Sequence, residues 1–342
     1  MRPERSATAI AHPNIALAKY WGKRGGDGNV PAVPSLSVTL AGMSTTTTVS
    51  FDATLVDDEL VLNGVPQASH ARTKVRASQL LDRVRAASGP SLGSSRARIV
   101  SANDFPTASG LASSASGFAA LALASVRAAG LDWSAERVAD LARQSSASAA
   151  RSLFGGFVEL DGGPEASGEG GHGAGAARAV AGPEVLDLRV IVCVTTEAEK
   201  VTSSTDGMGL TQANSPYYAA WLADAPVSHR LMRAALLAGD FARVGELAER
   251  SALVMHACAM AAGIVYVTGA TLAALDEVRA MRASGLSTYA TIDAGPHLKC
   301  LVRASDVAAA RARLERVPGV LRLIETTPGE GARVVTSDGG AS

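Results

Sequence analysis

The segment that most constrains the fold lies at residues 103–117, where a β-branched run leads through a loop of small residues into a long helix rich in Ala and Leu. Pro106 fixes one backbone dihedral, and Gly110 allows another molecule to approach the backbone closely. Ser113 and Ser114 place hydroxyl groups beside the free amides of the first helical turn, where the helix dipole favours an anion. This arrangement predicts a phosphate site, although an ordinary well-capped helix start has the same pattern.

The composition is typical of a globular protein with more than one domain. The chain has 342 residues, of which 47% are hydrophobic, and this is enough for two cores. Lys plus Arg and Asp plus Glu number 32 each, so no overall charge attracts nucleic acid or a membrane surface. No apolar signal core and no membrane-spanning window are present. We therefore expect a cytoplasmic protein that binds neither nucleic acid nor membrane.

Two residue types are scarce. The three cysteines are widely spaced and follow no metal-ligand pattern, so we expect buried free thiols and no dedicated metal site; they are Cys193, Cys258 and Cys300. Only five of the 32 basic residues are lysine, which makes each lysine a weak marker of a specific role. These lysines are Lys19, Lys23, Lys74, Lys200 and Lys299.

The N-terminal region joins a predicted strand at residues 7–11 to a segment of unusual composition. Residues 14–24 contain three cations, two aromatic rings and an Asn. Aromatic rings beside two scarce lysines favour the wall of a pocket for an anionic ligand, although an amphipathic surface segment has the same pattern. The candidate residues are Asn14, Lys19, Tyr20, Trp21 and Lys23.

Periodicity predicts further strands and a helix before the phosphate loop. Residues 35–52 are rich in Thr and Val and predict one long strand or a bent pair. Residues 60–64 predict a short strand that ends in an Asn-Gly turn. Residues 69–87 predict a helix whose Arg and Lys side chains lie on a solvated face.

A second run of small hydroxyl residues follows the helix predicted at residues 134–143, which Ser134 can cap. The run contains Ser146 and Ser148 and ends at Arg151, just before a Gly-Gly pair. This composition suits an oxyanion site beneath an Arg side chain, and it equally suits a plain connector between a helix and a strand.

Beyond a Gly-rich stretch at residues 161–177, which we interpret as a surface insertion, the pattern restarts and predicts an α+β layer sandwich. Asp293 follows a predicted strand and precedes Ala-Gly-Pro, so it either presents a carboxylate to a cleft or caps a tight turn. A polar loop is predicted at 200–206. The predicted strands are 188–195, 288–292, 298–302, 320–324 and one near Val334. The predicted helices are a series joined by short breaks over 215–261, one at 271–283 and one from Ser305.

The phosphate loop has the spacing Pro-x3-Gly-Leu-x-Ser-Ser (residues 106–114), which resembles the ATP-binding motif of the GHMP kinase superfamily. Three further segments narrow the resemblance. Residues 14–23 are NIALAKYWGK, residues 148–156 are SAARSLFGG, and residues 293–296 are DAGP. The order and spacing of these motifs resemble the diphosphomevalonate decarboxylase family over about residues 7–335.

The resemblance implies a two-domain α+β GHMP kinase fold with the active site between the domains. The expected domains are a ribosomal-protein-S5-like, ATP-binding domain at 1–183, a ferredoxin-like domain at 184–336, and a tail at 337–342. The implied activity belongs to isoprenoid biosynthesis. It uses ATP and Mg²⁺ to phosphorylate the 3-hydroxyl of mevalonate 5-diphosphate, and it releases ADP, phosphate and CO₂ to leave isopentenyl diphosphate. The resemblance also implies a homodimer.

The resemblance assigns roles residue by residue. Asp293 would orient or deprotonate the tertiary hydroxyl, Arg151 would grip the substrate carboxylate, and Lys19 would offset charge on the transferred phosphoryl group. The other implied substrate contacts are Asn14, Tyr20, Trp21, Lys23, Ser146, Ser148, Ser204 and Thr205. The implied nucleotide contacts are Pro106, Ser109, Gly110, Leu111, Ala112, Ser113 and Ser114, and Ser114 would also help the γ-phosphate and a magnesium ion that arrives with the nucleotide.

Departures from the family pattern lie close to the substrate. The chain has Ser-Ser-Ala-Ser at residues 145–148 where the family usually has Gly-Ser-Gly-Ser. Two related activities are therefore alternatives: a phosphomevalonate decarboxylase that uses the monophosphate, and a mevalonate 3-kinase that stops after phosphorylation. A third alternative is a silent GHMP-fold protein that binds a ligand without releasing ADP.

Overall fold

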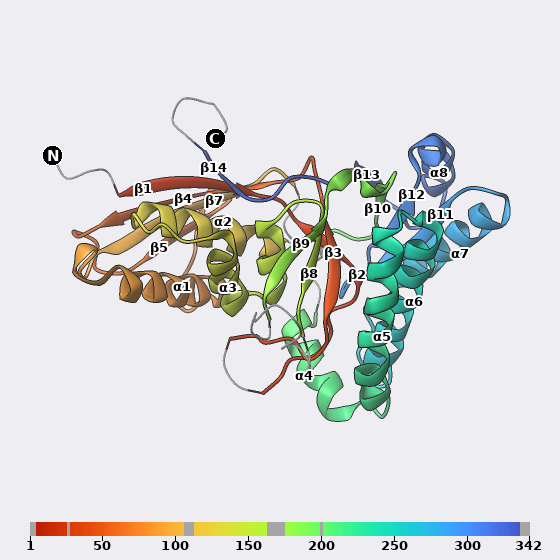
Figure 1. Ribbon diagram of the computed structural model, residues 1–342, viewed down its shortest axis with the longest axis horizontal. Helices are drawn as coiled ribbons and strands as arrows, with labels where there is room; N and C mark the ends of the chain where they lie inside the picture. The colour runs from red at the N-terminus through yellow and green to blue at the C-terminus, as the bar shows by residue number, and fades with distance from the viewer. Residues whose placement is uncertain (1–4, 26–27, 106–112, 163–174, 199–200, 336–342) are drawn as a thin grey trace.

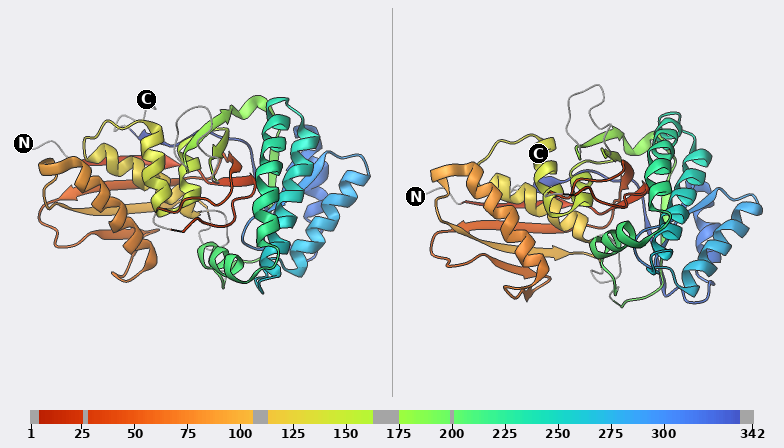
Figure 2. Two further views of the ribbon diagram at one scale, coloured as in Figure 1. Left: turned by 60° about the horizontal axis from the view of Figure 1, so that its bottom comes forward. Right: turned by 90° about the horizontal axis from the view of Figure 1, so that it is seen from below.

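The computed structural model describes residues 5–25, 28–105, 113–162, 175–198 and 201–335. Figures 1 and 2 show an elongated molecule with a sheet and its helices at each end and a third sheet between them. The chain crosses between the ends more than once, so the middle of the molecule is assembled from segments far apart in sequence.

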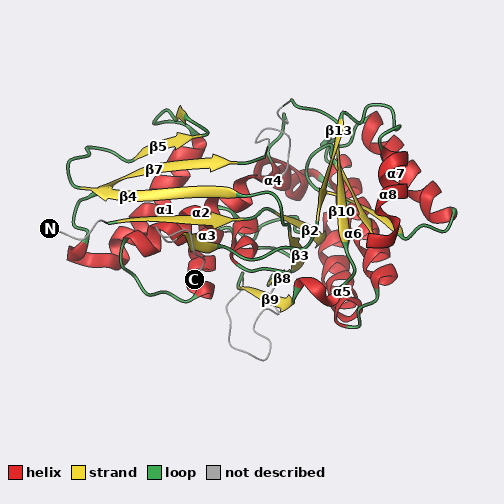
Figure 3. Ribbon diagram, turned by 90° about the horizontal axis from the view of Figure 1, so that it is seen from above, coloured by secondary structure: helices red, strands yellow, loops and turns green. Residues whose placement is uncertain are grey.

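The first sheet has six strands in the order β14-β1-β4-β7-β5-β6. Its long strands alternate buried and partly exposed residues, because one face packs on helices (Figure 3) and the other meets solvent. The strands are β1 (Ser6–Ala11), β4 (Thr45–Asp52), β5 (Glu59–Leu62), β6 (Val65–Pro66), β7 (Arg96–Asn103) and β14 (Arg333–Val335), and the helices are α1 (Arg72–Ser88), α2 (Ser113–Ala128) and α3 (Ala135–Ser145).

The middle sheet has the order β2-β3-β8-β9, and three of its strands are buried along their whole length. Apolar residues of β2 and β3 share one core with β10 (Arg189–Val194) and α6 (Phe241–Met260) of the far end, so this sheet joins the two ends of the molecule. The strands are β2 (Asn14–Ala18), β3 (Ser35–Thr39), β8 (Phe157–Leu160) and β9 (Ala177–Ala181).

The third sheet is antiparallel with the order β11-β12-β10-β13 and is covered by long helices. Its strands are β10 (Arg189–Val194), β11 (Thr288–Ile292), β12 (Leu298–Val302) and β13 (Arg322–Thr326), and its helices are α4 (Ser204–Asn214), α5 (Tyr218–Leu237), α6 (Phe241–Met260), α7 (Gly269–Ala283) and α8 (Val307–Leu314). Short 3₁₀ helices are η1 (Gly89–Ser91), η2 (Ala147–Leu153), η3 (Pro183–Val185) and η4 (Ala304–Asp306).

Three local predictions are confirmed. The Ser134 hydroxyl accepts a hydrogen bond from the Arg137 amide and caps α3. Asn63 and Gly64 form the turn between β5 and β6, with φ angles of 49° and 79° that Asn and Gly tolerate best. All three cysteines are buried and free.

Predictions about two stretches are refined. Residues 35–52 form two strands, as one of the two alternatives predicted, but β3 belongs to the middle sheet and β4 to the first sheet. The turn between them includes Gly42 at a φ of 71°. The strand near Val334 does not close the third sheet, since β14 pairs with β1. The chain therefore returns to its first sheet, and a domain division at residue 183 stays a prediction.

The prediction that the Arg and Lys side chains of α1 lie on a solvated face is wrong for Lys74 and Arg76. Lys74 is only 8% exposed and forms an ion pair of 2.8 Å with Asp57. The Arg76 guanidinium stacks over the Phe118 ring with its carbon 4.4 Å from the ring centroid. Helical periodicity identified the helix correctly, but it did not show that other elements cover the Lys74 and Arg76 side chains. Along the part of the chain that the structure describes, no helix is both long and apolar enough to cross a bilayer.

Candidate active site

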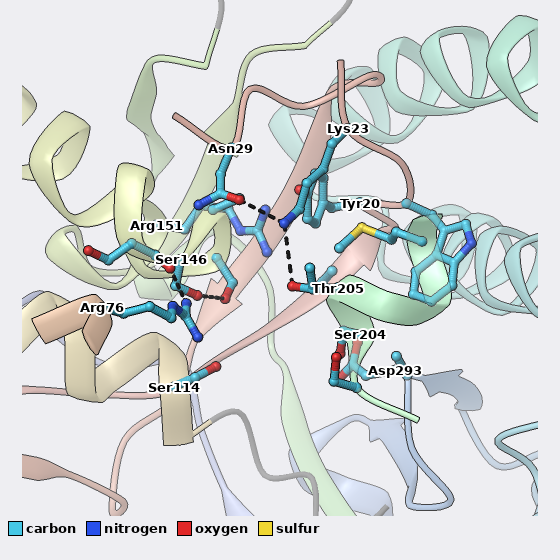
Figure 4. A pocket seen from close by; sticks show the side chains of 18 of the residues that line it. Tyr20, Lys23, Asn29, Arg76, Ser114, Ser146, Arg151, Ser204, Thr205 and Asp293 are labelled. Carbon is cyan, nitrogen blue, oxygen red and sulfur yellow. Dashed lines mark hydrogen bonds between the residues drawn. The ribbon is translucent and has the colours of Figure 1, made fainter. Parts of the chain in front are cut away.

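A cleft of about 780 Å³ lies between the helices of the first sheet and the near edge of the third sheet. Figure 4 shows it from close by. One side, called the first wall, is formed by Arg76 of α1, Ser114 of α2, and Arg151 of η2 with Ser146 just before it. Ser148 of η2 belongs to the same wall, because its hydroxyl lies beside that of Ser146. The opposite side, called the second wall, is formed by Ser204, Thr205 and Asp293, together with Lys19, which contacts Asp293.

Arg151 is the most buried group of the first wall, at 3% exposure. Its Nη1 donates to the Ser35 hydroxyl at 2.7 Å, and its Nε donates to Asn14 Oδ1 at 3.3 Å. Asn14 donates in turn to the Ser148 carbonyl at 3.0 Å and the Ser152 hydroxyl at 2.8 Å. Burial lowers the pKa of Arg151 to about 10, so the guanidinium stays charged at neutral pH. The arrangement holds a fixed cation under the serine run.

Arg76 supports the same run from α1. Its Nη2 donates to the Ser145 carbonyl while the guanidinium rests on Phe118. The hydroxyls of Ser146 and Ser148 lie 3.2 Å apart and face the cleft. The sequence was consistent with either an oxyanion site or a plain connector at this serine run. In the structure, the run presents hydroxyl groups to the cleft, and the guanidinium groups of Arg76 and Arg151 lie beneath it.

Lys23 connects the two walls. Its Nζ donates to Asn29 Oδ1 at 2.7 Å and to Thr205 Oγ1 at 3.3 Å, as Figure 4 shows. Asn29 Nδ2 donates to the Gln144 carbonyl at 2.8 Å, next to the serine run. Burial, together with the charge of Arg76, lowers the pKa of Lys23.

Tyr20 and Trp21 both line the cleft but differ in their surroundings. The Tyr20 hydroxyl is buried without a hydrogen-bond partner among the described residues, and burial raises its pKa. Trp21 is 2% exposed and packs edge-on against Tyr266, with 6.0 Å between ring centroids. The indole Nε1 of Trp21 is likewise buried without a hydrogen-bond partner among the described residues, so both side chains bring an unpaired polar atom to the cleft.

Asp293 stands at the end of β11 between two buried lysines. Lys19 Nζ lies 2.7 Å from Oδ1 and Lys299 Nζ lies 3.1 Å from Oδ2. Burial alone would raise the pKa of Asp293, but the two ammonium groups outweigh burial and hold it well below its usual range. The side chain remains 26% exposed, so the carboxylate is accessible from the cleft that it lines.

The charged groups in and beneath the cleft add up to an excess of positive charge. Burial lowers the pKa of Lys19 to about 8, with Asp293 opposing this effect, so Lys19 is mostly protonated at pH 7. Burial also lowers the pKa of the neighbouring His256 to about 4, so this ring is neutral. Lys19, Lys299 and Arg151 thus face one carboxylate. This imbalance favours an anionic ligand.

The start of α2 completes the first wall. Ser113 is the first residue of the helix, and both Ser113 and Ser114 line the cleft. The Ser116 hydroxyl lies 2.6 Å from that of Thr45, which ties the first turn of α2 to β4. The start of a helix at the cleft favours an anionic ligand there.

Comparison with known proteins places this geometry in a family. Residues 11–170 match the family described as diphosphomevalonate decarboxylase-like N-terminal domain, and residues 190–329 match the mevalonate 5-diphosphate decarboxylase C-terminal domain. A diphosphomevalonate decarboxylase of Gibberella zeae is 39% identical over 305 residues, which cover 85% of this chain and 79% of that protein. The chain belongs to the diphosphomevalonate decarboxylase family.

Solved structures of this family have the same fold. The crystal structure of mevalonate diphosphate decarboxylase from Staphylococcus aureus is 33% identical, covers 97% of this chain and 98% of its own, and has a TM-score of 0.88. A structure of MDDEF in complex with MVAPP, AMPPCP and magnesium is 36% identical, covers 96% of this chain and 98% of its own, and has a TM-score of 0.86. The expected α+β, two-domain GHMP kinase fold is confirmed.

The cleft brings together the described residues that the family resemblance singled out. Thirteen line it: Asn14, Lys19, Tyr20, Trp21, Lys23, Ser113, Ser114, Ser146, Ser148, Arg151, Ser204, Thr205 and Asp293. Their individual roles stay predictions. Ser204 and Thr205 lie in the first turn of α4 rather than in a loop, because Ser203 caps that helix. Pro106, Ser109, Gly110, Leu111 and Ala112 lie outside the described residues.

Sequence reasoning missed several members of the site. Arg76 and its neighbour Arg72 were assigned to a solvated helix face, and Asn29 was not among the candidate residues. For Asn29 no signal stood out. Lys299 belonged to the five scarce lysines, and of these Lys19, Lys23 and Lys299 lie in or beneath the cleft. The scarcity of lysine was therefore the signal that could have found Lys299.

The residues present fit a magnesium ion that is held mainly by a nucleotide. The described residues contain no group of three or more His, Cys, Asp or Glu that could hold a metal by itself. Asp293 is occupied by two ammonium groups and is a poor ligand for a further cation. The exposed Ser114 hydroxyl is a donor that Mg²⁺ accepts alongside phosphate oxygens.

Proposed function

We propose that this chain converts mevalonate 5-diphosphate and ATP into isopentenyl diphosphate, ADP, phosphate and CO₂. One observation supports the proposal most strongly: Arg151 from one half of the chain and the Lys19–Asp293 pair face each other across a single cleft. A reaction that needs both a fixed carboxylate and a phosphorylated alcohol uses these two walls together. Family membership and the complex of MDDEF with MVAPP and AMPPCP agree with this assignment.

Phosphoryl transfer occurs at the second wall. Asp293 stays ionised between its two lysines and accepts a hydrogen bond from the tertiary 3-hydroxyl, which aims the hydroxyl oxygen at the γ-phosphorus of ATP. The hydroxyl proton becomes acidic as the O–P bond forms, and Asp293 accepts it late in the step. Lys19 offsets the charge on the transferred phosphoryl group.

Decarboxylation depends on the first wall. The Arg151 guanidinium binds the substrate carboxylate with two parallel hydrogen bonds, and Ser35 and Asn14 hold the guanidinium in place. When phosphate leaves C3 with its bonding pair, the pair of the bond to the carboxylate forms the new carbon–carbon double bond and CO₂ departs. Arg151 thus keeps the breaking bond aligned.

The remaining contacts follow from the position of each group in the cleft. Tyr20 and Lys23 would bind the 5-diphosphate with Ser204 and Thr205, and Ser146 and Ser148 would position the substrate chain. The ATP phosphates would lie on the loop from Pro106 to Ser114, where Ser109, Gly110, Leu111, Ala112 and Ser113 are the further contacts. Bound Mg²⁺ would neutralise charge on the transferring phosphates.

Assembly and location are further parts of the proposal. We expect a homodimer that works in the cytoplasm, as the resemblance to the family implies. Light scattering of the purified full chain tests the assembly: a mass near twice 34.7 kDa agrees with it, and a mass near 34.7 kDa contradicts it. Fractionation of the native cells tests the location.

The function is tested by measuring ADP and CO₂ release with mevalonate, its 5-phosphate and its 5-diphosphate in parallel. We expect both products only with the 5-diphosphate. Release of both products from the 5-phosphate alone identifies a phosphomevalonate decarboxylase. ADP without CO₂ identifies a mevalonate 3-kinase, and binding without ADP identifies a non-catalytic protein. Each of these three outcomes contradicts the proposal.

A further inference from the structure

Lys299 is a buried cation to which the reaction outlined above gives no role beyond keeping Asp293 ionised. It lies in β12, where it faces Thr291 of β11 and Val192 of β10 in the register of the sheet. Its side chain is 2% exposed. Within the described residues its ammonium group has one partner, Asp293 Oδ2 at 3.1 Å.

The fold does not need Lys299 as a second cation beside Asp293. Lys19 at 2.7 Å already neutralises Asp293, so Lys299 leaves the buried cluster with net positive charge. Burying an ammonium group is costly even when it is paired, and the neighbouring Val192 and Leu301 belong to an apolar core. An apolar side chain would serve stability better, so the charge of Lys299 serves the site.

The two lysines hold Asp293 in different ways. Lys19 follows the end of β2, and its Nζ also donates to the Ala16 carbonyl at 2.8 Å, so it stands at the edge of the cleft with one hydrogen left for a ligand. Lys299 comes from the middle of a four-stranded sheet, behind the carboxylate and away from the cleft lining. One ammonium group can reach the substrate, and the other only holds the carboxylate.

We propose that Lys299 is a positioning residue for phosphoryl transfer: it holds Oδ2 of Asp293 from behind, so that Lys19 can turn toward the γ-phosphoryl group without releasing the carboxylate. This inference rests on the proposed function. Without Lys299, the carboxylate would lose its remaining partner whenever Lys19 turned, and it would rotate away from the tertiary hydroxyl.

The first test is the steady-state kinetics of Lys299→Met, which keeps the length of the side chain and removes its charge. Misplacing the group that aims the nucleophile should lower kcat about 10- to 100-fold. KM for mevalonate 5-diphosphate and for ATP should stay within about threefold, because Lys299 does not line the cleft. Leu301→Ala, on the same face of β12, is the control for damage to the core, and its kcat per folded molecule should stay within about twofold.

The second test is the pH dependence of kcat. The charge of Lys299 contributes to the low pKa of Lys19, so its removal should move the alkaline limb of the profile from about pH 8 to higher pH. The other groups near Lys19 are Asp293, Arg151 and the neutral His256, and none of them changes in this variant. Leu301→Ala should leave the limb in place.

The outcomes separate this inference from the proposed function. Inactive wild-type protein with mevalonate 5-diphosphate contradicts the proposed function. Active wild type combined with a Lys299→Met variant that keeps its kcat, or that loses kcat without moving the alkaline limb, overturns the inference alone. If Lys299→Met does not fold, Lys299→Gln keeps a donor to Asp293 but not the charge, and the same shift of the limb is expected.

Discussion

The two walls of the cleft are built on different principles. On the first wall each functional group is held by neutral partners from several elements, as Arg151 is held by Ser35 and Asn14. At the second wall Asp293 contacts two ammonium groups, that of Lys19 in the wall and that of Lys299 in β12 behind it. Hydrogen-bonded hydroxyls and amides define shape, whereas clustered charges define reactivity. The first wall is therefore suited to holding substrate, and the second to moving the phosphoryl group.

The largest expected effect is at the second wall. Asp293→Asn keeps the size of the side chain but removes the charge that orients the tertiary hydroxyl, so kcat for ADP release should fall about 10³-fold. Asp57→Asn is a matched control, because Asp57 also pairs with a buried lysine, Lys74, outside the cleft lining. A variant Asp293→Asn that keeps a tenth of wild-type activity would falsify the assignment of chemistry to this wall.

A smaller loss is expected at the first wall. Arg151→Lys keeps a positive charge but loses the planar pair of donors and the contacts with Ser35 and Asn14. We expect kcat/KM for mevalonate 5-diphosphate to fall about 10²-fold, which corresponds to about 2.7 kcal/mol of transition-state stabilisation. Arg178→Lys, at an arginine that pairs with Glu159, is the control. Equal kinetic constants for Arg151→Lys and wild type would show that the planar pair of donors of the Arg151 guanidinium is unimportant.

The pH dependence of kcat should depend on the second wall and not on the first, with a decline of about tenfold for each pH unit above pH 8. Lys19 acts in its protonated form, and its pKa is about 8, so kcat should decline above pH 8 by about tenfold for each pH unit. Arg151, with a pKa of about 10, should cause no decline in that interval. Initial rates between pH 6 and pH 9.5 with saturating substrates check this, and a flat profile throughout contradicts the role given to Lys19.

The smallest effect is expected where the walls meet. Asn29→Gly removes the amide that holds Lys23 and the Gln144 carbonyl, and it retains a residue that tolerates the φ of 54° at this position. KM for mevalonate 5-diphosphate should rise about three- to fivefold with kcat unchanged. Asn63→Gly, at the other described Asn with positive φ, should leave both constants as in wild type. A lower kcat at unchanged KM for Asn29→Gly would assign Asn29 to the chemical step instead.

Local signals were sufficient for much of this molecule. The serine run and Arg151 lie together in the sequence, so composition alone made an anion site one of two equal alternatives there. Alternation and capping residues such as Ser134 placed most strands and helices correctly. Tertiary contacts decided the rest: the burial of the basic face of α1, and the split of residues 35–52 between two sheets, depend on which elements pack together. Sequence periodicity carries no information about that choice.

The contacts at Asp293 also could not be predicted from the sequence. Asp293 alone was as consistent with a turn cap as with a functional carboxylate, since its two lysines are 274 and 6 positions away. Only the folded chain brings the three together. The scarcity of lysine hinted at a role for Lys299, but its partner could not be named from spacing.

The most direct test of the division between the walls is the ratio of CO₂ to ADP, measured in one assay with mevalonate 5-diphosphate. Wild type should release one CO₂ for each ADP. Asp293→Asn should slow both products together and keep this ratio, whereas Arg151→Lys should release less CO₂ than ADP, because the phosphorylated intermediate forms but is poorly held for elimination. The same ratio in all three proteins would contradict the account.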